Sequence, residues 1–188
     1  MPEGGRVIAG TARGIRLTVP PHGTRPLTDR VKESLFASLE SEGVLAQSFL
    51  DLFAGSGAAG IEALSRGAYD AVFVERDRRA CASIRTNLER TGLARGKVVC
   101  SDVFAYLNGD RKDVAFGAVF IDPPYDMPVL HAVLELVGAS GNVLLGSGSV
   151  VVAKHFWRDE VPEHIGTLTR TRQKRFGETM LSYYTRAG

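Results

Sequence analysis

The sequence predicts an α/β fold with a doubly wound, mostly parallel sheet, and three observations support it. Apolar, β-branched runs alternate regularly with helical segments through the middle of the chain. Two short strand-like segments around a Gly/Thr-containing turn, within residues 6–19, come first and predict a β-hairpin arm. Two further strand-like runs at 167–175 and 179–185 are typical of an antiparallel C-terminal strand pair. We therefore expect an N-terminal β-hairpin arm over residues 1–24 and one larger domain over residues 25–188.

Each element after the arm has its own signal. Thr28 or Asp29 offers a side-chain cap for a helix whose apolar residues recur at helical spacing. Five short, mostly apolar runs are then expected to form the core strands, at 49–53, 71–75, 97–100, 118–121 and 149–155. The segments between them have helical patterns, at 57–66, 77–91, 103–108 and 128–138. Because such strands are buried on both faces, helices must cover both sides of the sheet.

Composition places the chain among ordinary globular proteins. Of its 188 residues 44% are hydrophobic and 23% charged, and no stretch approaches the roughly 20 apolar residues that span a bilayer. The first residues lack the basic start and apolar run of a secretory signal. Cys81 and Cys100 lack metal-ligand spacing, and we expect both to be reduced core residues. These observations predict a cytoplasmic protein without a membrane segment or a disulfide framework.

Positive charge is concentrated toward both ends of the chain, although the net charge is only +2. Residues 1–32 hold six cations against two acids, residues 165–176 hold four cations and no acid, and residues 33–164 are net acidic. This asymmetry favours a polyanionic partner. A solvated surface explains it equally well, and the C-terminal run could be an edge strand that charge protects from aggregation. Charge alone leaves both interpretations open.

A glycine-rich loop, Asp51-Leu-Phe-Ala-Gly-Ser-Gly-Ala-Ala-Gly60, follows the first core strand. Gly55 and Gly57 permit a tight turn that a ligand can approach closely, and Gly60 lets the next helix pack near a strand. Glu75 ends the following core strand, where a carboxylate can accept hydrogen bonds from both hydroxyls of a ribose. The pattern predicts a nucleoside-containing cofactor, and both NAD and S-adenosylmethionine satisfy it.

Two acids favour S-adenosylmethionine over NAD. Asp51 precedes the glycines, where a carboxylate would repel the pyrophosphate of a dinucleotide but attract the ammonium of a methionine moiety. Asp122-Pro-Pro-Tyr125 ends the fourth core strand, at the edge where open sheets bind ligands. This could be a simple strand-ending turn, but its prolines make a rigid loop in which Asp122 and the Pro123 carbonyl could accept from a nucleobase amine. Tyr125 could stack on the base, so Asp122, Pro123 and Tyr125 are the expected catalytic residues.

A third acid, Asp102, ends the third core strand and could accept from an adenine amine, with the Val103 backbone at the ring edge. A lone Asp there is also a common helix N-cap, so both roles stay open. The residues expected to contact the cofactor are Asp51, Phe53, Ala54, Gly55, Ser56, Gly57, Gly60, Glu75, Asp102, Val103 and Asp122.

Together, DLFAGSGAAGIEALSRGA, VERD and FIDPPY resemble class I methyltransferases that act on an exocyclic nitrogen. With TRPLTDRVKESLF, the RVIAG–RGIRL arm and RQKRFGETMLSYY, essentially the whole chain is similar to one branch, the RsmD-type bacterial 16S ribosomal RNA guanine-N2 methyltransferases. The resemblance implies a seven-stranded, Rossmann-like sheet and methyl transfer from S-adenosylmethionine to N2 of the guanine conventionally numbered 966. It also implies 16S rRNA as the partner, within an assembled or partly assembled small ribosomal subunit. We further expect a monomer, and the chemistry calls for no metal.

Guanine N2 is a poor nucleophile, because its lone pair is delocalised into the ring. A hydrogen bond from N2–H to Asp122 would aim the amine at the methyl group, once the base has left its stack. The basic ends supply candidate phosphate contacts. Arg25, Thr28 and Arg30 could instead close over the cofactor. The full set of candidate RNA contacts is Arg6, Arg13, Arg16, Arg25, Arg30, Arg170, Arg172, Lys174 and Arg175.

Three other functions compete with this one. A methyltransferase of the same fold acting on adenine N6 or protein glutamine usually has Asn before the prolines. An NAD oxidoreductase is disfavoured by Asp51 and by the missing Tyr/Lys or His/Asp constellation. A non-catalytic RNA-binding module is disfavoured by the intact 122–125 loop.

Overall fold

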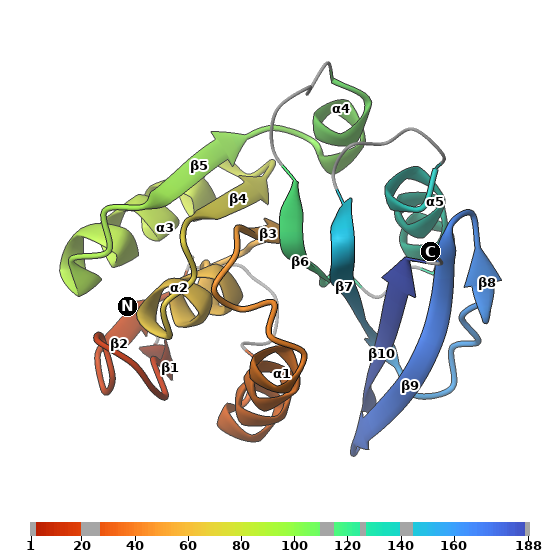
Figure 1. Cartoon of the computed structure of the whole chain (residues 1–188). Coiled ribbons are helices and arrows are strands. Elements are labelled where there is room, and N and C mark those ends of the chain that lie inside the picture. The colour runs from red at the N-terminus through yellow and green to blue at the C-terminus, as the bar shows by residue number, and fades with distance from the viewer. Residues whose placement is uncertain (1–2, 20–26, 110–114, 125–126, 140–144, 187–188) are drawn as a thin grey trace.

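The computed structural model describes residues 3–19, 27–109, 115–124, 127–139 and 145–186, and one mixed sheet runs through its centre. The strand order is β5-β4-β3-β6-β7-β10-β9-β8 (Figure 1). The parallel part consists of β3 (Phe49–Leu52), β4 (Ala71–Glu75), β5 (Gly96–Cys100), β6 (Phe116–Ile121) and β7 (Leu145–Phe156). The antiparallel part adds β10 (Thr179–Arg186), β9 (Leu168–Phe176) and the short β8 (His164–Ile165).

Helices cover both faces of this sheet, as its buried strands require. One face packs on α1 (Asp29–Ser41), α2 (Ala58–Ser65) and α3 (Arg78–Thr91), and the other on α4 (Val103–Asn108) and α5 (Met127–Val137). Side chains alternate between the two cores along each strand, so Phe49 and Phe73 face the first layer while Leu50 and Val74 face the second. None of the helices in the described ranges is long and apolar enough to cross a membrane.

The predicted fold class is confirmed, including the parallel core strands and the antiparallel C-terminal pair. Thr28 caps α1 through its hydroxyl, which accepts from the Val31 N–H at 3.4 Å. β8 was not predicted, because two residues are too few to show a periodic pattern. The cysteine prediction was wrong in part: both thiols are free, but Cys100 is exposed rather than buried.

The N-terminal arm is a hairpin of β1 (Glu3–Arg6) and β2 (Arg16–Thr18). The hairpin is as expected, but β1 begins before the predicted segment 6–19 and overlaps it only at Arg6. It is packed on the sheet's helices rather than extended from them, since Val7, Ala12 and Leu17 are buried in the first core. Gly10 has a φ of 83°, and a Cβ there would lie 1.8 Å from the Ser65 carbonyl oxygen, so only glycine lets the arm approach α2 this closely. The predicted boundary between residues 24 and 25 lies outside the described residues.

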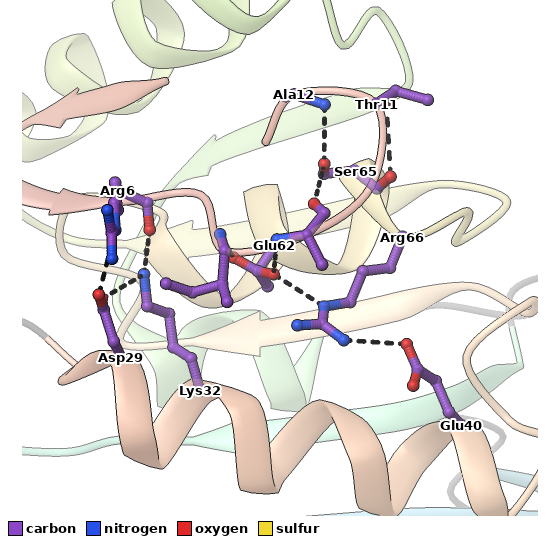
Figure 2. Close-up of polar contacts among 11 residues, drawn as sticks. Arg6, Thr11, Ala12, Asp29, Lys32, Glu40, Glu62, Ser65 and Arg66 are labelled. Atoms are coloured by element: carbon purple, nitrogen blue, oxygen red, sulfur yellow. Dashed lines mark hydrogen bonds and ion pairs between the residues drawn. The ribbon is translucent and has the colours of Figure 1, made fainter. Parts of the chain in front are cut away.

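Charged side chains join the arm to α1 and α2, in a group that we call the arm cluster: Arg6, Asp29, Lys32, Glu40, Glu62 and Arg66 (Figure 2). Glu62 is fully buried, and its carboxylate accepts from the Ile8 N–H at 2.8 Å and the Ala9 N–H at 3.0 Å. It also accepts from Arg66 Nε at 2.7 Å, and Arg66 continues to Glu40 at 3.0 Å. Opposite charges therefore alternate along the cluster.

Lys32 is the second fully buried charge of the arm cluster. Its Nζ donates to the Arg6 carbonyl and lies 3.8 Å from Asp29 Oδ1 (Figure 2). Burial lowers the pKa of Lys32, while the nearby carboxylates of Glu62 and Asp29 oppose that shift. The arm is thus held by backbone N–H and C=O groups that contact charges from two different helices.

Candidate active site

The loop after β3 turns sharply into α2 at the carboxyl edge of the sheet. Gly57 caps α2 with a φ of 78°, in the left-handed region that favours glycine. Phe53, a non-glycine residue, also has a positive φ of 61°, and such strained positions cluster at ligand sites. A Cβ at Gly60 would lie 2.3 Å from the Phe73 ring of β4, so Gly60 allows the close helix–strand packing predicted from the sequence.

Two of the predicted acids hold this loop by its N–H groups. Glu75, at the end of β4, accepts from the Gly55 N–H through Oε2 at 2.9 Å. Asp51, on β3, accepts from the Gly60 N–H through Oδ2 at 2.9 Å. The two carboxylates therefore bind the glycine loop at Gly55 and at Gly60. A nucleoside with a cationic substituent would have to lie along this loop to contact both acids.

Asp51 is almost completely buried, and its pKa is raised well above the ordinary range. Burial is the main cause, and the hydrogen bond from Gly60 opposes it. The nearby carboxylates of Asp122 and Glu75 raise the pKa further. A positively charged group beside Asp51 would relieve both the desolvation and the repulsion, so this position favours a cationic ligand.

Asp122 follows the last residue of β6 and contacts a lysine that was not predicted from the sequence. Its Oδ1 accepts from Lys154 Nζ at 2.6 Å, and the two side chains are only 17% and 10% exposed. Burial raises the pKa of Asp122, and the Lys154 ammonium opposes that shift. Lys154 could have been found from its position, because it is a single charge at the carboxyl end of an apolar core strand, where ligands bind.

Asp102 precedes α4 and caps it. Its Oδ1 accepts from the Phe104 N–H at 2.8 Å and the Ala105 N–H at 3.3 Å. The helix-cap interpretation is therefore confirmed, while the contact to an adenine amine stays a prediction. Val103, which would lie at the ring edge, is buried as the first residue of α4.

The four acids come from neighbouring strands and meet at one edge of the sheet. In strand order they are Asp102 after β5, Glu75 on β4, Asp51 on β3 and Asp122 after β6. This edge can bind a cation and accept hydrogen bonds from ribose hydroxyls and amines. Within the described ranges, no group of three or more His, Cys, Asp or Glu residues could hold a metal ion. Tyr125 lies outside the described residues.

The basic residues of the arm are exposed. Arg13 and Arg16 lie at the surface, and the Arg6 side chain is 63% exposed even though it pairs with Asp29 at 3.2 Å. Arg30 is also exposed, and its guanidinium lies 5.9 Å from the Phe176 ring centroid. Arg25 lies outside the described residues.

The basic residues of β9 are less exposed overall and contact other parts of the chain. Arg172 pairs with Glu42 at 3.2 Å and lies over the Tyr183 ring, and Lys174 donates to the Ser38 hydroxyl at 3.1 Å. Arg170 donates to the Val161 carbonyl, and Arg175 lies 3.7 Å from the Trp157 ring centroid. These contacts give the C-terminal cations a structural role. It differs from the alternative drawn from the sequence, which was an edge strand that charge protects from aggregation.

Known proteins share this fold and sequence. "Putative rRNA methyltransferase YlbH" of Bacillus subtilis (strain 168) is 38% identical over 186 residues, covering 97% of this chain and 100% of that protein. "Ribosomal RNA small subunit methyltransferase D" of Escherichia coli (strain K12) is 41% identical over 137 residues, covering 72% of this chain and 68% of that protein. The solved structure of "Putative methyltransferase yhhF from Escherichia coli" is 33% identical with a TM-score of 0.86, covering 99% of both chains.

A family model described as "Conserved hypothetical protein 95" matches residues 5–185, nearly the whole chain. This match agrees with the glycine loop, the strand-end acids and the docked arm. The chain therefore belongs to that family, the RsmD-type methyltransferases.

Proposed function

We propose that this protein transfers the methyl group of S-adenosylmethionine to N2 of a guanine in 16S rRNA, the guanine 966 type, within the small ribosomal subunit. The main observation in support is the row of four acids around the glycine loop, from Asp102 to Asp122. The relatives named as ribosomal RNA small subunit methyltransferases support the substrate class.

The residues of the glycine loop and its neighbours fit the proposed cofactor. When bound, it would supply a methyl group already activated by a sulfonium charge. Asp51 would face the ammonium of the methionine moiety, directly or through water, which fits a buried carboxylate whose pKa is raised by burial. Glu75 would accept from the ribose hydroxyls, and Asp102 with Val103 would contact the adenine.

The chemistry required of the chain is mainly positioning. Asp122 would accept an N–H of the guanine amine, and the Pro123 carbonyl could accept the second. Fixing the amine in line with the methyl group can lower the barrier by several kcal/mol, on the order of 7–11 at most. The methylated amine is acidic enough to lose its proton afterwards, so Asp122 needs to orient the amine and need not be a strong base.

The test is methylation of small subunits that lack the modification, with labelled S-adenosylmethionine and mapping of the labelled nucleotide. Wild-type protein should label one guanine, and free 16S rRNA serves as the comparison substrate. Asp122→Asn, which keeps a side-chain oxygen at this position, should still bind cofactor and lose most turnover. Label on adenine or on protein, or full activity of Asp122→Asn, would overturn the proposal.

A further inference from the structure

We propose that Lys154 is a positioning residue of this active site: it holds Oδ1 of Asp122 and so aims the second carboxylate oxygen at the substrate amine. The inference rests on the proposed function, in which Asp122 accepts an N–H from the target base. It adds a residue on a different strand, β7, to the machinery.

The geometry of the contact is fixed by the sheet. Ile121 of β6 pairs with Ala153 of β7, so Asp122 and Lys154 are the next residues along two hydrogen-bonded neighbours. The Nζ–Oδ1 distance of 2.6 Å is that of a strong, charge-assisted hydrogen bond. Both side chains are mostly buried, and Lys154 lies within β7, which continues to Phe156. The lysine is therefore held in place and limits rotation of the Asp122 carboxylate.

The charges around Asp122 explain why the ammonium of Lys154 matters for the ionisation of this carboxyl group. Among the residues that the structure describes, the charged groups that face Asp122 are Lys154 from β7 and Asp51 from β3, with Glu75 of β4 beyond Asp51. Burial favours the protonated form of Asp122, and the Lys154 ammonium opposes it. Without Lys154, Asp122 would be left with carboxylates as its described charged neighbours and would hold its proton to higher pH. A protonated Asp122 has a donor where the substrate amine needs an acceptor.

Three variants separate charge from shape. Lys154→Met removes both the charge and the hydrogen bond, whereas Lys154→Gln removes the charge and keeps a donor. Lys97→Met, at an exposed lysine on β5, is the matched control. The rate of methylation of unmodified small subunits, as kcat/KM, is measured against pH for each.

In wild-type protein we expect the rate to rise with pH as Asp122 ionises, and this rising part of the profile is its acid limb. Both Lys154 variants should shift that acid limb to higher pH, by about 1–3 units for the loss of a neighbouring opposite charge. Lys154→Gln should keep more of the plateau rate than Lys154→Met, and Lys97→Met should match wild type. Adding Asp122→Asn to Lys154→Met should abolish the limb.

A second measurement is independent of RNA and of turnover. The carboxyl carbon of Asp122 can be followed by ¹³C NMR in the protein alone and identified by its absence in Asp122→Asn. The midpoint of its pH titration should be higher in the Lys154 variants than in wild type. Unchanged midpoints and acid limbs in folded Lys154→Met or Lys154→Gln would overturn the inference. If wild-type protein methylates no RNA, the proposed function fails, while the NMR titration still decides whether Lys154 controls Asp122.

Discussion

This protein buries charge in two places, and the two are built in opposite ways. In the arm cluster, Glu62 and Lys32 are fully buried, and carboxylates and cations alternate so that each charge has a partner. At the carboxyl edge of the sheet, Asp122 pairs with Lys154, but Asp51 is buried without such a described ion pair. Burial raises the pKa of Asp51, and the like charges of Asp122 and Glu75 raise it further. Alternating buried charges hold a structure together, whereas carboxylates gathered around a buried acid cost stability and are typical of a binding site.

The largest effect should come from breaking a pair in the arm cluster. Glu62→Gln keeps the side-chain shape but leaves Arg66 and Lys32 without this buried negative charge. The free energy of unfolding, measured by urea titration, should therefore fall by about 3–5 kcal/mol. Glu40→Gln removes the exposed partner of the same Arg66 and should cost less than about 1 kcal/mol. Equal losses from the two variants would mean that the cluster does not depend on buried pairing.

At the carboxyl edge, Glu75→Ala should act on ligand binding more than on folding. We expect the affinity for S-adenosylmethionine, measured by calorimetry, to fall by about 1.5–3 kcal/mol, because hydrogen bonds to a charged group are lost. The same protein should not bind NAD. Unchanged affinity in the variant would remove Glu75 from the site, and tight NAD binding would overturn the cofactor assignment.

Asp51→Asn should change stability in the opposite direction to Glu62→Gln, and by less. Because burial raises the pKa of Asp51, the folded protein holds this proton more tightly than the unfolded chain. Wild-type stability should therefore fall as pH rises from the ordinary carboxyl value toward the raised one, and the whole penalty is present above it. The amide of the variant cannot ionise. The free energy of unfolding of the variant should therefore rise relative to that of wild type over this pH window, as measured by urea titrations at several pH values. A constant difference across pH would contradict this.

The smallest effects should separate the two basic ends of the chain. Replacing Arg13 and Arg16 with Gln should reduce the slope of log K against log salt for RNA binding, by about 0.7–0.9 for each phosphate that the protein no longer neutralises. Replacing Arg172 and Lys174, which contact Glu42 and Ser38, should leave that slope nearly unchanged. Cofactor affinity should be the same in both variants. A smaller slope in the β9 variant alone would reverse this ranking of the two ends.

Local patterns predicted most of the fold, because strand and helix periodicity and caps such as Thr28 depend on neighbours in the chain. The acids Asp51, Glu75 and Asp122 could be placed together, since the carboxyl ends of parallel strands share one edge. The contact between Lys154 and Asp122 joins residues 32 positions apart. The sequence places Lys154 near the carboxyl end of a core strand, but it does not show which acid the lysine contacts. The contacts of the buried Glu62 with the N–H groups of Ile8 and Ala9, and of the buried Lys32 with the Arg6 carbonyl, were missed for the same reason.

The position of β10 has a consequence for synthesis of the chain on the ribosome. β10 lies between β7 and β9, yet it is translated after both, so β7 has an open edge until the β9–β10 hairpin arrives. That edge includes Val150–Ala153, an uncharged run with high β-propensity, which is the kind of segment that pairs with other chains. About 30 residues separate the end of β7 from the end of β10, which is a few seconds of translation at roughly 5–20 residues per second. During that interval the nascent protein should be most prone to aggregate, and docking of the hairpin ends the risk by covering the exposed strand.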